Sequence, residues 1–305
     1  RSSTAPAPAR RRSATATAAA NDRIAPQTTE LAPVEVYPNA AWETPHRIDP
    51  FDVSLEEKAA VLFDASRAAL AVDGVQFVSG RLSVVKERRL VATSEGSLVQ
   101  QTFIRQNPFV TVTAVSPDRS DFQSRVSDVA AAARGWEYIA DLDWPALATR
   151  WAEEAVMKLT APSVEPGAWD LVLHPSNLWL TIHESIAHPT ELDRALGYEA
   201  NYAGTSFLAP PAEVLNTTRL GPDFMTFMGN RTEVGGCATC GWDDEAVPAF
   251  EWPIIDDGIF VNYQTTREQA AWIAEYTGMT RSQGCAYGQN WASIPFQRMP
   301  NVSLM

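Results

Sequence analysis

The sequence of 305 residues is short of cysteine and histidine and has no long apolar run. Its cysteines, Cys237, Cys240 and Cys285, are too few and odd in number for a disulfide scaffold. Because no run of about 18 apolar residues is present, we predict no membrane-spanning helix and no membrane partner. A phosphate-binding glycine loop and a Gly-x-Ser-x-Gly motif are also missing, so neither site is a candidate here.

Positive charge is also scarce, and the formal net charge is −13. This excess of acid argues against nucleic acid as a partner, because phosphate groups repel negative charge. Hydrophobic residues make up 45% of the chain, which is ordinary for a globular protein long enough for two domains. The chain begins at Arg1 and ends at Met305, and we expect a fragment truncated at the C-terminus and also at the N-terminus.

Residues 1–35 consist mainly of Ala, Ser, Thr, Pro and Arg, with no acidic residue before Asp22. This composition cannot bury a core, so we predict a disordered segment. An Arg- and Ser-rich, acid-poor start is also typical of a targeting segment. We expect a cytoplasmic protein, with an exported form as the alternative.

Residues 36–162 predict an α+β domain. Ser54 and Glu57 form a capping box for a helix to about Val72. Four strand-like runs then predict an antiparallel meander with turns at Gly80, 94–96 and 106–108: 75–79, 82–92, 98–105 and 109–115. Two further helices are expected, at 122–133 and from Asp143 to about Leu159. The prolines and glycine of 160–167 predict the domain boundary.

Residues 163–305 predict a second domain of strands, loops and short helices. We expect a strand at 169–173 and, with Ser176 as its N-cap, a helix through 178–188. The Asp257-Gly258 turn predicts a hairpin of strands 249–255 and 259–263. A helix at 267–276 and a long loop at 277–297 complete the prediction.

The chemistry concentrates in His183, Glu184 and His188, which lie within an apolar run. Neutral imidazoles hold zinc, and a carboxylate can take a proton from metal-bound water. The histidines are five residues apart, which turns them about 140° from one another in a regular α-helix. A π-bulge would realign them, and such bulges are frequent at functional sites. The alternative is a helix with hydrogen-bonded core histidines.

A catalytic zinc site usually needs a third protein ligand, and the sequence leaves several candidates open. Cys237 and Cys240 form a Cys-x-x-Cys motif without a βαβ context, so we expect reduced thiols there. The acidic run 243–245 is expected to be a solvated turn, and His46 to lie at the surface. His174 could point at the site but is more typical of a helix cap. The remaining candidates are Cys285, Glu191, Asp193 and Glu199.

These motifs, taken in order, resemble the TldD/PmbA family of metallopeptidases, on the TldD side. Residues 183–188 match the family's His-Glu-x-x-x-His helix, and Gly204-Thr205-Ser206-Phe207 resembles the Gly-Thr-Ser-x-Phe-like stretch that follows it. The run 243–245, the Asp257-Gly258 hairpin and the stretch 298–301 are similar to later landmarks. The resemblance covers roughly 53–305.

The resemblance implies an α+β fold, with an N-terminal domain of antiparallel sheet and helices. It implies a C-terminal metallopeptidase domain, mostly β and incomplete here, that carries the zinc-binding helix. Zinc (Zn2+) would be held by His183 and His188, with Glu184 as general base. The family's third ligand is a cysteine beyond Met305, and none of the three cysteines here matches it.

The resemblance also implies a homodimer or a heterodimer with a related subunit, acting on unfolded or extended peptides. Such peptides could pair with a sheet edge. Our leading hypothesis is therefore a zinc metallopeptidase in which Glu184 activates zinc-bound water. The alternatives are a non-catalytic peptide-binding subunit of a TldD/PmbA-like complex and a thiol oxidoreductase using Cys237 and Cys240.

Overall fold

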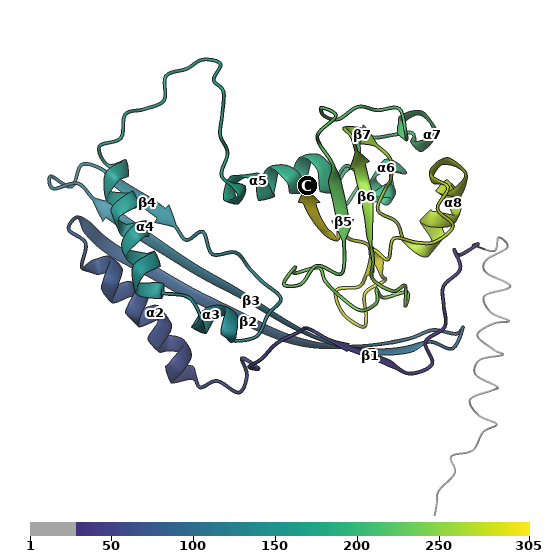
Figure 1. Ribbon diagram of the computed structural model, residues 1–305, viewed down its shortest axis with the longest axis horizontal. Coiled ribbons are helices and arrows are strands. Elements are labelled where there is room, and N and C mark those ends of the chain that lie inside the picture. Colours follow the sequence, from purple (N-terminus) through teal and green to yellow (C-terminus); the bar gives the residue numbers. More distant parts are fainter. Residues whose placement is uncertain (1–28) are drawn as a thin grey trace, which may run out of the picture.

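Two long antiparallel strands connect the two halves of the computed structural model, which describes residues 29–305 (Figure 1). They are β2 (Val75–Ala92) and β3 (Leu98–Val115), joined by the predicted turn at 94–96. At one end β3 also pairs in parallel with β1 (Ala40–Glu43), and at the other end it pairs with antiparallel β4 (Phe122–Val126). The sheet is therefore mixed, with β1 as its parallel strand, and the α+β class is confirmed.

Two long strands replace the four strands predicted in this region, because the chain does not turn at Gly80 or at 106–108. At Gly80 the chain stays extended, since an added Cβ would lie 3.2 Å from Leu62 of helix α2 (Leu55–Leu70). Glycine here permits close approach of the helix and is not a turn signal. Pro108 lies in β3 in the same phase as Gln106, whose N–H points away from β2 to the carbonyl of Ala132. The N–H that proline lacks would thus point to the open edge of β3, where proline is tolerated.

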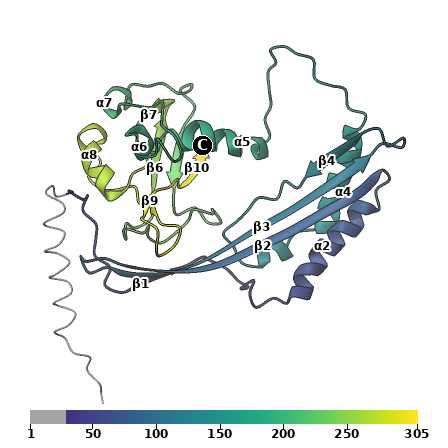
Figure 2. The same cartoon turned by 180° about the vertical axis from the view of Figure 1, so that it is seen from behind.

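The buried side of β3 changes along its length. Val99, Gln101 and Phe103 are buried at odd positions, whereas from Ile104 to Ala114 the buried residues are at even positions. Successive strand residues face opposite sides of a sheet, so the two ends of β3 are covered from opposite sides. The two views from front and back agree with this: helices lie under one end and the C-terminal half lies over the other (Figure 2).

Helices α2 and α4 (Trp144–Lys158), together with α3 (Glu137–Ala140), cover the end of β3 at which the even-numbered residues are buried. As predicted, Ser54 caps α2 and Asp143 caps α4, with Pro145 in the first turn. The core between helices and sheet contains Trp136, Trp151 and Val112. The predicted helix at 122–133 is wrong, because Phe122–Val126 forms β4 and Arg125 pairs with Glu154 of α4 at 2.5 Å. The alanine-rich stretch behind it, which favours a helix, is irregular.

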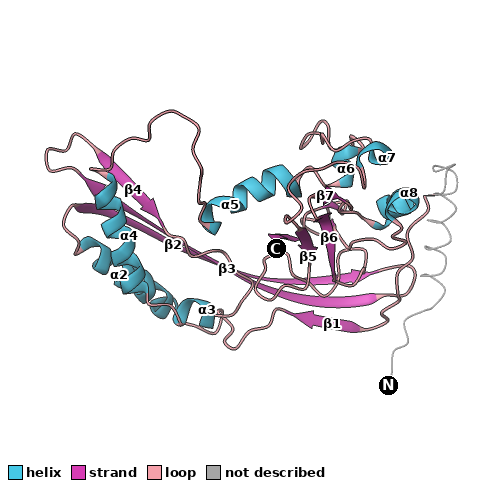
Figure 3. Ribbon diagram, turned by 45° about the horizontal axis from the view of Figure 1, so that its top comes forward, coloured by secondary structure: helices cyan, strands magenta, loops and turns pink. Residues whose placement is uncertain are grey.

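The chain then crosses to the C-terminal half through a long connection without regular structure (Figure 3). The predicted strand at 169–173 lies in this connection and does not form. Its Trp169, Leu171 and Val172 are exposed, so no neighbouring strand of the described chain completes a sheet with it.

The C-terminal half contains a small sheet of order β10-β5-β6-β7 and several short helices. The hairpin at Asp257-Gly258 and the helix α8 are confirmed. The predicted loop 277–297 additionally forms the short pair β8–β9. The core includes Trp252, Phe260 and Tyr263. The remaining elements are α5 (Pro175–Ile182), η1 (His183–Ala187), α6 (Leu192–Ala195), α7 (Pro211–Val214), β5 (Phe227–Asn230), β6 (Glu251–Asp256), β7 (Ile259–Phe260), α8 (Arg267–Thr277), β8 (Ala286–Tyr287), β9 (Phe296–Gln297) and β10 (Asn301–Leu304).

The segment 1–35, predicted to be disordered or targeting-like, lies mostly outside the described residues. Within the described part, residues 29–35 have no regular structure, but Ala32 is buried and its backbone exchanges hydrogen bonds with Arg267 at 2.8–2.9 Å. None of the described helices is both long enough and apolar enough to cross a membrane.

Candidate metal centre

Helix α5 and the π-helical turn η1 position the two histidines of the motif. His174, not Ser176, is the N-cap of α5, and its Nδ1 accepts a hydrogen bond from the Ser176 N–H at 3.2 Å. Pro175 occupies the first turn, where its missing N–H costs nothing. At the other end the N–H of His188 donates to the carbonyl of His183 at 3.0 Å, an i→i+5 bond. The expected π-bulge is therefore present.

The bulge brings the two imidazoles together. Their ring centroids are 4.4 Å apart at an interplanar angle of 76°. One ligand atom from each of His183, Glu184 and His188 lies within 4.8 Å of the other two. The side chains are 38%, 59% and 21% exposed, respectively. The histidines are therefore not core residues, and solvent or a ligand can reach all three groups.

A buried carboxylate orients one of the imidazoles. Nδ1 of His188 lies 2.8 Å from Oε2 of Glu191, a side chain with no exposed surface. Nε of Arg194 donates to the same oxygen at 2.5 Å. With a proton held at Nδ1 by the carboxylate, the neutral ring of His188 has its lone pair on Nε2. This is the arrangement in which metal-binding histidines are commonly held, so the residues fit a metal that prefers nitrogen and oxygen donors.

The other candidate ligands lie elsewhere among the described residues. Glu191 contacts the imidazole itself, and Asp193 and Glu199 lie in a buried cluster beyond Arg194. His174 is used as a cap, and half-buried His46 bonds the Thr44 carbonyl.

The three cysteines are free thiols, and none belongs to the His183–Glu184–His188 group. Cys237 and Cys240 do line the same cavity as the histidines, a space of 460 Å³. Burial raises the pKa of Cys285 to about 12 and raises the pKa values of Cys240 and Cys237. Because a reactive thiol needs a lowered pKa, the geometry disfavours thiol redox chemistry.

The cavity beside the histidines has a cationic wall that the sequence did not indicate. Arg89 and Arg105 come from β2 and β3, whereas Arg231 and Arg298 come from the C-terminal half. Arg231 is 6% exposed and donates to the carbonyls of Ala238 and Arg298 and to Cys240 Sγ. No spacing rule connects four arginines scattered over more than 200 residues, so only the fold brings them together.

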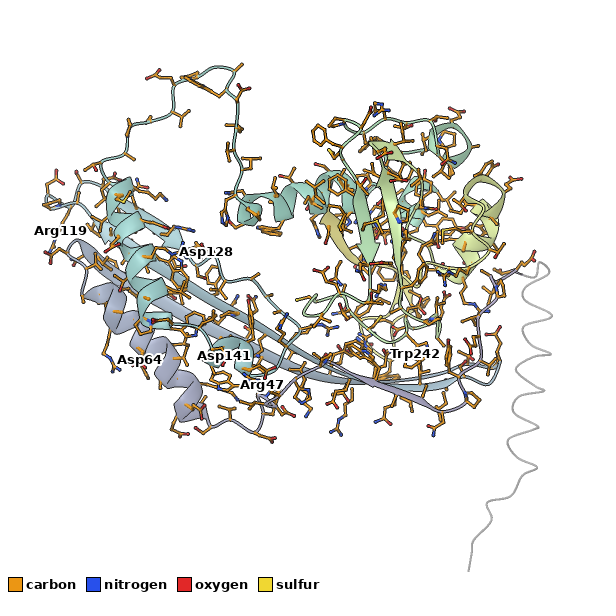
Figure 4. All side chains as sticks on the ribbon, in the orientation of Figure 1. Arg47, Asp64, Arg119, Asp128, Asp141 and Trp242 are labelled. Carbon is orange, nitrogen blue, oxygen red and sulfur yellow. The ribbon has the colours of Figure 1, made fainter. Side chains whose placement is uncertain are left out.

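The acidic run 243–245 is not the solvated turn that we expected. Asp243 is buried and accepts hydrogen bonds from three backbone N–H groups, those of Glu245, Val247 and Ala286. Asp244 pairs with Arg89 of β2 at 2.8 Å. The preceding Trp242, labelled in Figure 4, lies where the C-terminal half meets the long sheet, and its carbonyl accepts from Gln101 at 2.9 Å. The run therefore fixes one wall of the cavity to the long sheet.

Comparison with known protein families gives two adjacent matches. The PmbA/TldA metallopeptidase central domain matches residues 48–161, and the PmbA/TldA metallopeptidase C-terminal domain matches residues 166–304. A metalloprotease of Methanocaldococcus jannaschii is 26% identical over 84% of this chain and 52% of its own length. A metalloprotease of Synechocystis is 28% identical over 83% of this chain and 51% of its own length. The chain thus spans about half the length of these relatives.

Solved structures share the fold. A Thermotoga maritima protein superposes with a TM-score of 0.63 at 17% identity, covering 91% of this chain and 56% of that protein. TldE from Thermococcus kodakarensis gives a TM-score of 0.59 at 15% identity, covering 83% of this chain and 52% of TldE.

Proposed function

The chain belongs to the PmbA/TldD family of metallopeptidases, and from this premise we propose that it is the zinc-binding part of a TldD-like peptidase. The observation that carries the proposal is the π-helical turn that brings His183 and His188 to 4.4 Å beside Glu184. We assign His183 and His188 as metal ligands and Glu184 as the general base.

Each side chain of the proposed site has a stated role. Glu191 keeps a proton on Nδ1 of His188, which leaves Nε2 for the metal. Zinc, when bound, supplies Lewis acidity that lowers the pKa of water and polarises a carbonyl. The Glu184 carboxylate takes a proton from the attacking water and delivers it to the leaving amine nitrogen. Its partial exposure lets it reach both water and substrate.

The substrate that we propose is an unfolded or extended peptide. The cavity contains Phe103 and Met299 beside arginines, and it lies against the long sheet, which suits a chain with both apolar and polar groups. We further propose that the protein works as a homodimer or with a related subunit.

The assignment of Glu184 is tested by Glu184→Gln, which keeps the shape of the side chain and removes the base. We expect zinc content to stay at the wild-type level while peptide cleavage falls by a factor of at least about 10². Metal analysis and turnover of an unfolded peptide are the two measurements, and exposed Glu213→Gln is the matched control. Wild-type turnover by Glu184→Gln would refute the role.

A non-catalytic peptide-binding subunit remains the second candidate, because the described residues bring only two imidazoles and one carboxylate together. Zinc analysis of the protein distinguishes the two. Peptide binding without stoichiometric zinc would favour the binding subunit.

A further inference from the structure

A second cavity, of 720 Å³, adjoins the cavity beside the histidines, because Tyr287 and Arg298 line both cavities. Its charged lining is strongly unbalanced. A single cationic side chain, Arg298, faces four carboxylates contributed by separate elements: Asp193, Glu199, Glu245 and Glu268. We call this space the acidic cavity.

Two of these carboxylates are deeply buried and have an oxygen with no hydrogen-bond partner among the described residues. Asp193 is 3% exposed and its Oδ1 is unpartnered. Glu199 is 4% exposed; its Oε1 accepts from Arg298 at 3.1 Å, and its Oε2 has only Arg194 at 3.7 Å. Arg194 is already engaged by Glu191 and the Ala203 carbonyl. Asp193 and Glu199 lie close enough to share a proton between their carboxyl groups. A cation in the cavity would stabilise both groups in their ionised forms.

The acidity of these groups agrees with an excess of negative charge. Burial, followed by the nearby Glu199 and Glu191, raises the pKa of Asp193 to about 7. Burial, followed by Asp243, raises the pKa of Glu245 to about 7. Arg298 and Arg194 contact Glu199, but at Asp193 and Glu245 the nearby arginines do not offset the effect of burial on the pKa.

The shape and spacing indicate an organic cation. Within the described chain, only His183, Glu184 and His188 converge closely enough to hold a bare metal ion, so the four carboxylates line a space and do not form a compact ligand set. Aromatic side chains complete the wall: Tyr198, Tyr202, Tyr287 and Phe296. Aromatic faces attract ammonium and guanidinium groups and pack against alkyl stems. Arg298 already lies over Phe296 and Arg89 over Tyr287, so Tyr198 and Tyr202 are the rings that we expect a ligand cation to contact.

We propose that the acidic cavity is a specificity subsite that binds an ammonium or guanidinium group of the peptide held at the metal centre. The cation is either a lysine or arginine side chain or the peptide's own α-ammonium group. This inference rests on the proposed function for the position of the peptide, but its test measures binding and needs no cleavage.

The test uses the protein with Glu184→Gln, so that bound peptide is not consumed. Fluorescence anisotropy compares extended labelled peptides that carry lysine or the isosteric norleucine at each position in turn, with a free or acetylated N-terminus. We expect at least one cationic peptide to bind about tenfold more tightly than its neutral counterpart. Loss of the preference on acetylation identifies the α-ammonium group, and loss on norleucine substitution identifies the side chain.

Variants connect this preference to the acidic cavity. Asp193→Asn should reduce the preference to about threefold or less. Glu268→Gln, at the more accessible rim, should have the same effect and serves if Asp193→Asn does not fold. Affinity for the neutral peptide should not change. Glu275→Gln, on an exposed part of the same helix α8, is the control and should keep the full preference.

Two results would overturn the proposal. One is equal binding of charged and neutral peptides by the parent protein. The other is calorimetric binding of Ca2+ or Mg2+ that Asp193→Asn abolishes, with no effect of peptide charge. Cleavage by the wild type without charge preference would reject only the subsite, whereas charge preference without any cleavage would reject only the peptidase.

Discussion

The smallest unit on which the proposed function depends is the hydrogen bond between His188 and Glu191. The sequence predicted His188 as a metal ligand and offered Glu191 only as a possible further ligand. A spacing of three residues allows either role. In the structure Glu191 is a partner of Nδ1, because the turn at 188–190 brings its carboxylate to that nitrogen, and Glu191 does not line the cavity.

Replacing this carboxylate should weaken metal binding without removing a ligand. In Glu191→Gln the amide accepts a weaker hydrogen bond and no longer enforces the proton on Nδ1 of His188. We expect zinc affinity to fall by about 10- to 100-fold. Competition with a chromogenic chelator measures it.

The control for this change is Glu213→Gln, an exposed glutamate outside the cavity. Because Glu191 also holds Arg194, thermal unfolding of both variants has to be followed. Unchanged zinc affinity in a folded Glu191→Gln protein would exclude the orienting role.

At the scale of elements, the π-helical turn η1 explains a spacing that a regular helix cannot use. Imidazoles five positions apart are aligned only because the i→i+5 bond from His188 to His183 accommodates one extra residue. Removing one residue from the turn should therefore restore a regular α-helix and keep both imidazoles on the same helix face.

Deleting exposed Ser185 should convert η1 into a regular α-helical turn with histidines four apart. We expect zinc affinity within about tenfold of the wild type, because both imidazoles still share one face. Inserting an alanine after Ser185 instead turns the imidazoles apart and should lower affinity more than about 100-fold. Chelator competition compares the two, and equal loss in both would contradict the π-bulge argument.

The elements also show where the sequence was a sufficient guide. Helix caps at Ser54 and Asp143 and the hairpin at Asp257-Gly258 depend on neighbouring residues, and these predictions are confirmed. Gly80 and Pro108 were wrongly predicted as turns. The strand accommodates Gly80 because helix α2 packs against it, and Pro108 because it lies at an open sheet edge. Both causes are tertiary contacts, which a local sequence pattern does not contain.

At the scale of the whole molecule, the cavity beside the histidines exists because the long sheet brings the two halves together. Arg89 of β2 pairs with Asp244, and Gln101 of β3 bonds the carbonyl of Trp242. These partners are more than 100 residues apart in the sequence. The histidine motif could be predicted from sequence, whereas the two cavities could not. The cationic wall is made by this docking, and the acidic cavity is made by segments of the C-terminal half that lie as much as about 100 residues apart in the sequence.

The C-terminal half also buries several acids in its interior, and this should make stability depend on pH in an unusual direction. Burial raises the pKa values of Asp193 and Glu245 to about 7 and that of Asp243 to about 6, from ordinary values of 3.8, 4.5 and 3.8. The folded protein therefore binds more protons than the unfolded chain between about pH 4 and pH 7, and its stability falls as pH rises through this window. We expect the free energy of unfolding to be about 2–4 kcal/mol lower at pH 8 than at pH 5.

Carboxylates with lowered pKa values, such as Asp128 and Glu95, act only below this window. Urea unfolding at both pH values measures the difference, which Asp193→Asn combined with Glu245→Gln should reduce. Greater stability of the wild type at pH 8 would show that these carboxylates are ionised in the folded protein at little cost.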